Sequence, residues 1–136
     1  MSNIVSIGTS VPGASSGSLS RTVTTTPITL SQFGLAIPQG ANRVILDATV
    51  GITSSLLAPV LLFNVLRGNA VIFSCRQEVL LSTGQELTVS FQAIDSNVPA
   101  TSNQGYTLTV QLESSLLVGA TVTGPVTFSG ISYTYG

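Results

Sequence analysis

The side chains that could carry out chemistry are few in this chain and of limited types. Its 136 residues include no histidine, one cysteine and five carboxylates, which are Asp47, Glu78, Glu86, Asp95 and Glu113. Without histidine, neither a Ser-His-Asp nor a Cys-His arrangement can form, and Cys75 has no candidate base beside it. Structural zinc needs several Cys or His ligands, and the sequence has no phosphate loop or dinucleotide fingerprint. We therefore expect no enzyme activity and no cofactor.

The carboxylates are scattered along the chain rather than paired. Three of them fall on the polar faces of separate predicted strands, so a glycosidase pair would form only by an accident of folding. Asp95, Asn97 and Asn103 offer oxygen ligands of the kind that calcium binds, within one stretch. The same residue types form turns, which is the simpler interpretation. We predict no metal site.

Two alternating segments within residues 85–113 organise the rest of the chain. Each has an apolar face, formed in the first by Leu87, Val89, Phe91 and Ala93 and in the second by Tyr106, Leu108, Val110 and Leu112. This period of two predicts half-buried strands. The turn formers between them predict that the chain doubles back into a hairpin, whose dry faces a second sheet must cover.

The first half of the chain shows the same periodicity. Residues 44–52 alternate clearly and predict a strand that follows a turn at residues 38–42. Residues 22–37 predict two short strands with a bend at residues 31–34. Pro27 places the first of them at a sheet edge or at the start of a strand.

Residues 60–77 form the most apolar stretch. Gly68 and Asn69 tolerate positive φ, which predicts a tight hairpin. Apolar residues on both faces indicate a central strand or a face covered by another subunit. Cys75 falls in this stretch. It is interpreted either as a small buried hydrophobe or as a residue near a symmetry axis, where an intersubunit disulfide could form.

The last predicted strand runs from Gly124 and Pro125 to Tyr135. Its alternation changes phase at Gly130, and a β-bulge there would bring both apolar sets onto one side. Turns or loops are predicted at residues 82–84 and 114–119. With roughly eight to ten short strands and no helical period, residues 22–136 are predicted to form an all-β jelly-roll sandwich.

Residues 1–21 differ from this pattern, because they are rich in Ser, Gly and Thr and contain no run long enough for a core strand. We predict a flexible N-terminal arm or connector. It holds four β-branched apolar residues, which would gain nothing in a solvated tail: Ile4, Val5, Ile7 and Val11. The alternatives are a disordered terminus and an assembly arm that adds to a sheet edge or fills a groove on a neighbouring subunit.

The charge balance limits the partners. Charged residues make up 7% of the chain and the formal net charge is −1, whereas roughly 25% charged residues are usual in a soluble domain. Lysine is absent and the four arginines do not cluster, so nucleic acid is not expected as a partner. Weak charge gives little repulsion between copies, which suits a subunit of a permanent assembly.

The N-terminal residues lack the basic start and apolar run of a secretory signal, and no apolar stretch is long enough to span a bilayer. We therefore expect synthesis in the cytosol and no membrane partner. The Thr-rich, lysine-free composition is nevertheless typical of an extracellular structural protein. Release by lysis or during assembly would reconcile the two observations.

Four successive stretches carry a resemblance to a known group: FNVLRGNAVIFSCRQEV from Phe63 onward, then ELTVSFQAIDSNVP, GYTLTVQLES and GPVTFSGISYTYG. Their order of strands and turns resembles the tumour-necrosis-factor-like jelly rolls of Bacillus-type spore surface proteins. The chain departs from parts of that group, because it has neither a collagen-like Gly-x-y repeat nor a Cys-rich N-terminus.

The resemblance implies a structural subunit of an extracellular fibre or spore appendage, in which trimeric heads are joined by N-terminal arms. Such a protein would be made without a signal peptide and released with the spore, and an anchor or tip protein could join it. We expect a homotrimer with an interface at Phe128, Tyr133, Tyr135 and Cys75. The alternative is a jelly-roll module of a phage fibre or capsid, which binds a glycan or receptor through Tyr133, Tyr135 or the loop at residues 95–103.

Overall fold

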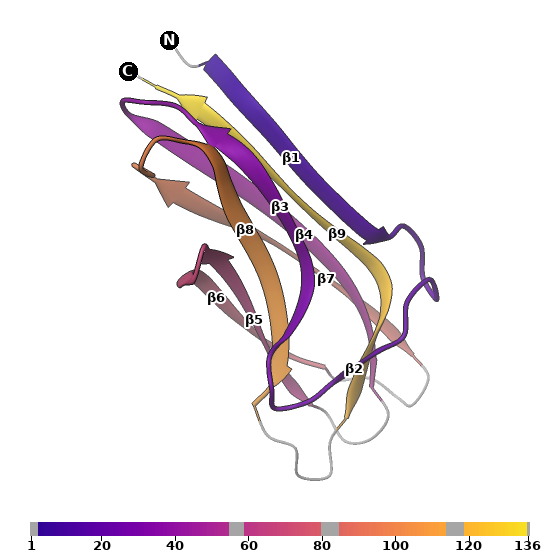
Figure 1. Cartoon of the computed structure of the whole chain (residues 1–136). Helices are drawn as coiled ribbons and strands as arrows, with labels where there is room; N and C mark the ends of the chain where they lie inside the picture. The colour runs from indigo at the N-terminus through magenta and orange to yellow at the C-terminus, as the bar shows by residue number, and fades with distance from the viewer. Residues whose placement is uncertain (1–2, 55–58, 80–84, 114–118, 136) are drawn as a thin grey trace.

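The computed structural model describes residues 3–54, 59–79, 85–113 and 119–135, and the regular elements in these ranges are all β-strands (Figure 1). Sheet A contains β1 (Asn3–Gly13), β2 (Arg21–Val23), β4 (Asn42–Ser54), β7 (Glu86–Ser96) and β9 (Ala120–Thr134). Sheet B contains β3 (Ile28–Ile37), β5 (Val60–Arg67), β6 (Ala70–Glu78) and β8 (Thr101–Leu112). The predicted turn at residues 82–84 and most of the predicted loop at residues 114–119 lie outside the described residues.

The strand order is that of a jelly roll. Sheet A has the order β1-β9-β4-β7, with β2 pairing with the other end of β9, and sheet B has the order β3-β8-β5-β6. The pairings are antiparallel, and the chain crosses repeatedly from one sheet to the other. Two such sheets stacked face to face form a double Greek key. The predicted all-β jelly-roll sandwich is confirmed.

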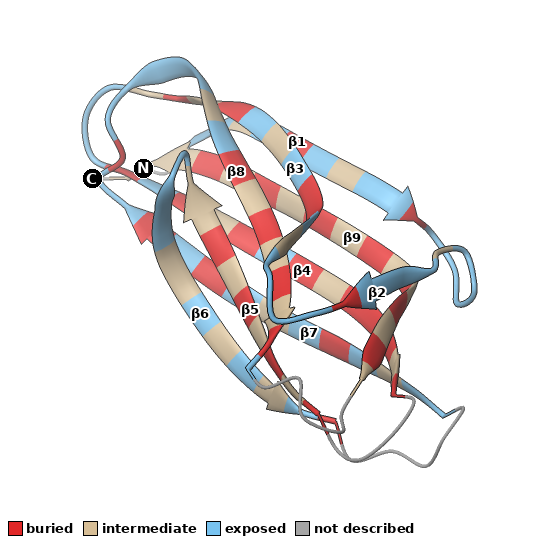
Figure 2. Cartoon of the chain, turned by 60° about the horizontal axis from the view of Figure 1, so that its bottom comes forward, coloured by how far each residue is buried: buried red, intermediate tan, exposed pale blue. Residues whose placement is uncertain are grey.

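The core lies between the two sheets and follows from the alternation of the strands. Every second residue of β9 from Ala120 to Ser132 is buried, and β4, β5 and β8 show the same alternation in Figure 2. Each large apolar side chain removed from water in this way contributes about 1.5–3 kcal/mol. The largest fully buried side chains are Tyr106, Phe63, Phe128, Leu46, Ile52, Leu61 and Leu108.

The hairpin predicted within residues 60–77 is confirmed. β5 pairs with β6 across a turn in which Gly68 has φ 58°, a conformation that glycine adopts without a steric cost. The N–H of Gly68 also donates to the carbonyl of Gly105 at 3.0 Å, so the turn is tied to β8. β5 is a central strand of sheet B, as one of the two alternatives for this stretch required, whereas β6 is an edge strand.

The predicted hairpin between residues 86 and 113 is wrong. Both segments are strands, but β7 pairs with β4 in sheet A, whereas β8 pairs with β3 and β5 in sheet B. Their apolar faces therefore belong to opposite sheets, and Phe91 of β7 packs across the core on Phe63 of β5 and Phe73 of β6. Periodicity identifies the dry face of each strand, and it does not identify the hydrogen-bonding partner.

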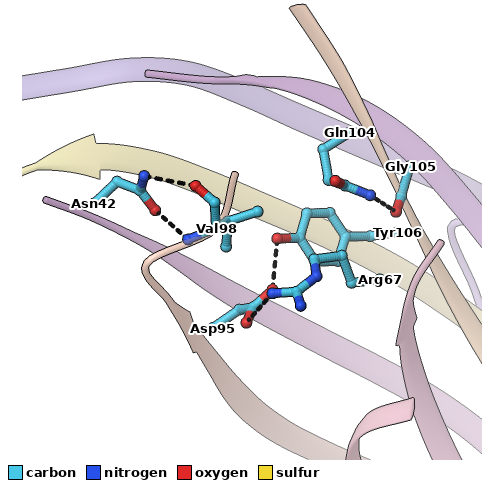
Figure 3. A network of polar contacts seen from close by, with 7 residues as sticks. All are labelled: Asn42, Arg67, Asp95, Val98, Gln104, Gly105 and Tyr106. Carbon is cyan, nitrogen blue, oxygen red and sulfur yellow. Dashed lines mark hydrogen bonds and ion pairs between the residues drawn. The ribbon is translucent and has the colours of Figure 1, made fainter. Parts of the chain in front are cut away.

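Two polar networks fix the connection between β7 and β8, which passes from sheet A to sheet B (Figure 3). The Asn42 side chain is buried, donates to the Val98 carbonyl and accepts from the Val98 N–H, both at 2.9 Å. Arg67 donates to both carboxylate oxygens of Asp95 at 3.0 and 3.1 Å, and the Tyr106 hydroxyl donates to Asp95 at 2.9 Å. Both ends of the connection are thus fixed to other strands, which favours a crossing over a hairpin.

In β3 and β9, the irregularities of the strand lie at other residues than predicted. β3 is continuous through residues 31–34, and its register shift lies between Thr29 and Ser31. β9 begins at Ala120, and the cis Gly124–Pro125 bond lies within it, opposite a register shift between Val50 and Ile52 of β4. The bulge expected at Gly130 is absent from the pairings of β9. The residues after Gly130 therefore keep their alternation.

Residues 1–21 were predicted to hold no core strand, and Asn3–Gly13 forms the edge strand β1 along β9. Small residues explain the fit. A Cβ atom on Gly8 or Gly130 would lie 2.4 or 2.8 Å from the ring of Phe33, so only glycine leaves space for this side chain. The Ala36 N–H donates to the Ser6 hydroxyl at 3.2 Å and ties β1 to β3. Two roles were considered for the arm, addition to a sheet edge and filling of a groove. β1 adds to a sheet edge, and that edge belongs to its own chain. The predicted boundary between residues 21 and 22 stays a prediction.

Candidate functional site

The outer face of sheet A carries an apolar row that crosses its four main strands. Ile7 of β1 pairs with Ile131 of β9, Ile131 pairs with Ile45 of β4, and Ile45 pairs with Ile94 of β7. Directly paired residues of neighbouring strands project from the same face of a sheet. These four side chains, hereafter the isoleucine row, therefore lie side by side on the surface that points away from the core.

The isoleucine row is open to solvent at both ends. Ile7 is 63% exposed and Ile94 is 58% exposed, while Ile45 and Ile131 are partly covered by their neighbours. Figure 2 shows β1 as mostly exposed beside the alternating strand β9. Large exposed apolar side chains that adjoin one another are characteristic of interaction surfaces, whereas single exposed ones are ordinary.

One level toward the start of β4, larger side chains flank the isoleucine row. Ile4, Tyr133, Arg43 and Ser96 are paired across the four strands at this level. The Arg43 guanidinium lies 4.4 Å from the centre of the Tyr135 ring, and the Tyr135 hydroxyl donates to Asn97 at 3.4 Å. Hydrogen bonding with Tyr133 raises the pKa of Arg43, with a smaller effect of Tyr135, so this group remains a cation.

One level toward the end of β4, the flanking side chains are smaller and polar. They are Thr9, Ser129, Asp47 and Gln92, again paired across the four strands. The amide of Gln92 donates to the Asp47 carboxylate at 3.3 Å. The next level, which contains Thr127, Thr49 and Ser90, is polar as well. The apolar surface is therefore a band with a cationic side and an anionic side.

The residues predicted to act in assembly are only partly brought together. Ile4 and Ile7 lie on the outer face of sheet A, and Val5 and Val11 of β1 are also exposed. Tyr133 belongs to the same face. Of the predicted trimer interface, Phe128 is wrong, because it lies in the core at 1% exposure and packs on Phe33 with ring centres 4.8 Å apart.

Cys75 lies elsewhere. It pairs with Phe63 on β5, is partly buried against the core and is a free thiol. This position on the inner face of sheet B agrees with the role of a small hydrophobe. Its predicted part in an interface stays a prediction.

In the loop considered as a calcium site, Asp95 and Asn97 already accept hydrogen bonds from other side chains of the chain. The Asp95 carboxylate is 7% exposed and is already bound by Arg67 and Tyr106, while Asn97 accepts from Tyr135. Within the ranges that the structure describes, no group of three or more His, Cys, Asp or Glu is close enough to hold a metal ion. The same ranges contain no helix that could cross a membrane.

A second surface feature lies on the opposite side of the sandwich. An open cavity of about 300 Å³ lies over the paired glycines Gly34 and Gly105, on the outer face of sheet B. It is lined by Gln32, Phe33, Gly34, Asn103, Gly105, Tyr106 and Thr107. Two amide side chains and a hydroxyl around a floor without side chains can bind a polar group. Asn103 is the one residue of the predicted binding loop that lines it.

The sequence contained an unused signal for the isoleucine row. Ile45 and Ile94 occupy the polar faces of strands that otherwise carry Arg, Asp, Thr, Ser, Glu and Gln at the outward positions. Ile131 was expected to turn inward through a bulge at Gly130. Each isoleucine taken alone is an ordinary exception, and only the strand order places the four together.

Comparison with known proteins identifies the fold. No protein-family model and no curated protein matches the sequence. Among solved structures, a structure of the T13 IBDV viral particle matches 98% of this chain with a TM-score of 0.56 at 11% identity. The infectious bursal disease virus VP2 subviral particle matches 98% of the chain with a TM-score of 0.54 at 12% identity. The chain spans 35% and 37% of these virus chains. At this identity the match shows a shared β-sandwich fold.

Proposed function

We propose that this chain is a structural subunit that self-assembles into a larger particle through the outer face of sheet A. The isoleucine row is the observation that carries this proposal. A sandwich of two sheets needs one apolar face per sheet, and sheet A has its core face filled by Leu46, Val50 and their neighbours. The isoleucine row adds nothing to that core, so a partner surface is the reason for its position.

The low charge of the chain supports the same function. With a formal net charge of −1, copies repel one another weakly, and outward serine and threonine side chains allow close approach. The two similar structures come from a viral particle and a subviral particle, which are assemblies of many subunits. This likeness of fold favours a structural, non-enzymatic role for the present chain.

The narrower form of the proposal is a fibre or spore appendage subunit with trimeric heads joined by N-terminal arms. The resemblance of residues 63–136 to spore surface jelly rolls supports it, and so does the exposure of Ile4, Val5, Ile7 and Val11 on β1. An extracellular position and an anchor or tip protein belong to the same proposal. Negative-stain microscopy tests this form, since fibres, closed shells and discrete oligomers have different outlines.

Substitution on the isoleucine row tests the general proposal. The double variant Ile94→Thr/Ile131→Thr keeps β-branched residues in the strands but removes apolar area from the outer face. Each isoleucine buried at a contact contributes about 1.5–3 kcal/mol, so association should weaken by at least ~100-fold. Sedimentation velocity over a range of concentrations measures this change.

A matched control places the same change on the other sheet. Leu62 and Leu66 of β5 are partly exposed on the outer face of sheet B, and Leu62→Thr/Leu66→Thr should associate as the wild type does. A wild-type protein that remains a monomer up to high micromolar concentration would contradict the proposal. Equal weakening by both double variants would contradict the choice of sheet A.

The cavity on sheet B favours one second function, which is binding of a glycan. Gln32, Asn103 and Thr107 place hydrogen-bonding groups around the floor formed by Gly34 and Gly105. A glycan array probed with wild type and with Gln32→Ala/Asn103→Ala tests this function. Signals that disappear in the variant support it, and an array without signals rejects it.

A further inference from the structure

We propose that the partner of the isoleucine row is the same row of a second copy, related by a two-fold axis that runs along the row, across the strands. This inference rests on the proposed self-assembly and specifies its geometry. The axis would lie in the plane between the two stacked outer faces. The strands of the two copies would then run in opposite directions, and each isoleucine would meet its own counterpart.

Charge complementarity singles out this axis. β4 carries one cation and one anion, Arg43 and Asp47, which lie two residues to either side of Ile45 on the same face. Rotation about the isoleucine row exchanges these two levels. Arg43 of each copy then lies over Asp47 of the other, and two intermolecular ion pairs form. An axis parallel to the strands and running over β4 would instead place Arg43 over Arg43, which like charges disfavour.

Side-chain size gives a second, independent argument. The same rotation places the level of Ile4, Tyr133 and Arg43 over the level of Thr9, Ser129 and Asp47. Ile4 then faces Thr9, Tyr133 faces Ser129 and Arg43 faces Asp47, so each large side chain meets a smaller one. Two sheets that stack about 10 Å apart need such interdigitation. An unrelated partner would not require one face to be complementary to itself in both size and charge.

The expected contact is small. Four strands about 4.8 Å apart, overlapping over about eight residues of about 3.3 Å each, cover roughly 500 Å² on each copy. The total of roughly 1,000 Å² is at the lower limit of specific interfaces. The contact alone should therefore be weak and dependent on concentration. In a particle, many such contacts act together.

A charge-exchange series tests the axis with the full chain. Arg43→Asp and Asp47→Arg should each weaken association by at least ~10-fold in sedimentation velocity, because both place like charges opposite each other. The double variant Arg43→Asp/Asp47→Arg should associate like the wild type, because the exchange restores both pairs. An equimolar mixture of the two single variants should also associate. Glu78→Arg, on the exposed edge strand β6, is the matched control and should leave association unchanged.

Site-directed crosslinking provides a measurement that does not depend on charge. In a Cys75→Ser background, Ile45→Cys lies on the axis and should form crosslinked dimers with a short bismaleimide. Arg43→Cys should crosslink with Asp47→Cys in a mixture more efficiently than either variant does alone. Circular dichroism confirms that each variant is folded.

The outcomes separate the two proposals. If all chains remain monomeric, the proposed self-assembly fails and the axis fails with it. Suppose that the isoleucine variants abolish association, and that the double charge-exchange variant associates as weakly as the single variants. Self-assembly then stands and the axis is overturned. Crosslinking of Arg43→Cys to itself as readily as to Asp47→Cys would also overturn the axis.

Discussion

The outer faces of the two sheets are built by the same alternation but carry different side chains at comparable central levels. Across sheet A the row reads Ile7, Ile131, Ile45 and Ile94, whereas across sheet B the row reads Thr29, Thr109, Asn64 and Ser74. On sheet B, the Ser74 hydroxyl donates to the Asn64 side chain, so part of this row is satisfied within the monomer. On sheet A, the aliphatic row remains in contact with water.

This difference separates what a sheet needs for folding from what it offers to a partner. Inward residues are constrained by the core on both sheets, and their apolar character says nothing about assembly. Outward residues are free to be polar, as in the central row of sheet B. An apolar outward row on one sheet therefore indicates a use outside the monomer, and this conclusion can be tested by separating stability from association.

The largest effect is expected for substitutions on the two faces of β9. Phe128→Ala should lower the free energy of unfolding by about 3–5 kcal/mol, because it leaves a cavity beside Phe33. Ile131→Ala, three residues later on the outer face, should lower it by less than about 1 kcal/mol. Urea denaturation at low protein concentration measures both values. A similar loss for both variants would mean that the isoleucine row serves the monomer's own stability.

The next effect concerns two ion pairs, one between the two sheets and one on the surface of sheet B. Asp95→Ala should lower the free energy of unfolding by about 2–3 kcal/mol, because it leaves the buried Tyr106 hydroxyl and Arg67 without their acceptor. Glu113→Ala removes the partner of Arg76, whose side chain is 68% exposed, and should cost less than about 1 kcal/mol. Chemical denaturation of both variants compares them directly. Equal losses would contradict the central role given to Asp95.

A pH effect of moderate size is expected from Tyr106 of sheet B. Burial, followed by the hydrogen bond to Asp95, raises the pKa of this phenol well above its ordinary value. Stability is therefore fully present below about pH 10, and above it the unfolded chain loses a proton that the folded chain retains. The free energy of unfolding should fall by about 1.4 kcal/mol per pH unit from this group.

The variant Tyr106→Phe isolates this contribution. The variant retains Tyr133, Tyr135 and Cys75, so the difference between wild type and variant reports on Tyr106. Urea denaturation at pH 9, 10 and 11 measures the free energy of unfolding of both proteins. As the pH rises, this free energy should fall more steeply for the wild type than for the variant. A difference that is independent of pH would contradict the assignment.

The smallest effect is expected for glycines on the two sheets. A Cβ atom on Gly105 would meet no atom within 4 Å, so Gly105→Ala should stabilise by about 0.5 kcal/mol through the unfolded state. On Gly130, a Cβ atom would lie 2.8 Å from Phe33 and 2.9 Å from Leu46, so Gly130→Ala should destabilise. Thermal unfolding gives the sign for each. Destabilisation by Gly105→Ala would show that the floor of the sheet B cavity tolerates no side chain.

Local patterns in the sequence predicted the elements of the fold well. The alternation in β4, β7 and β8 identified the strands and their buried faces, because a period of two is a property of each strand alone. The β5–β6 hairpin was also predictable, since Gly68 lies between two segments that are adjacent in the chain. The arm was mistaken for a tail, because serine and glycine lower strand propensity and the space for Phe33 is not visible locally.

The candidate site was predictable only in part, and the reason is geometric. The sequence by itself determined that the chain is all β, which side chains point inward, and that Ile4 and Ile7 are apolar residues without a place in the core. The tertiary structure decided that β7 pairs with β4 and not with β8, and that Tyr133 and Ile131 point outward. It also decided that isoleucines from four strands far apart in the sequence lie at one level of the sheet. Alternation is set by neighbouring residues, whereas strand order and register depend on hydrogen bonds between segments far apart in the chain. A row that crosses a sheet therefore exists only once those long-range pairings are made.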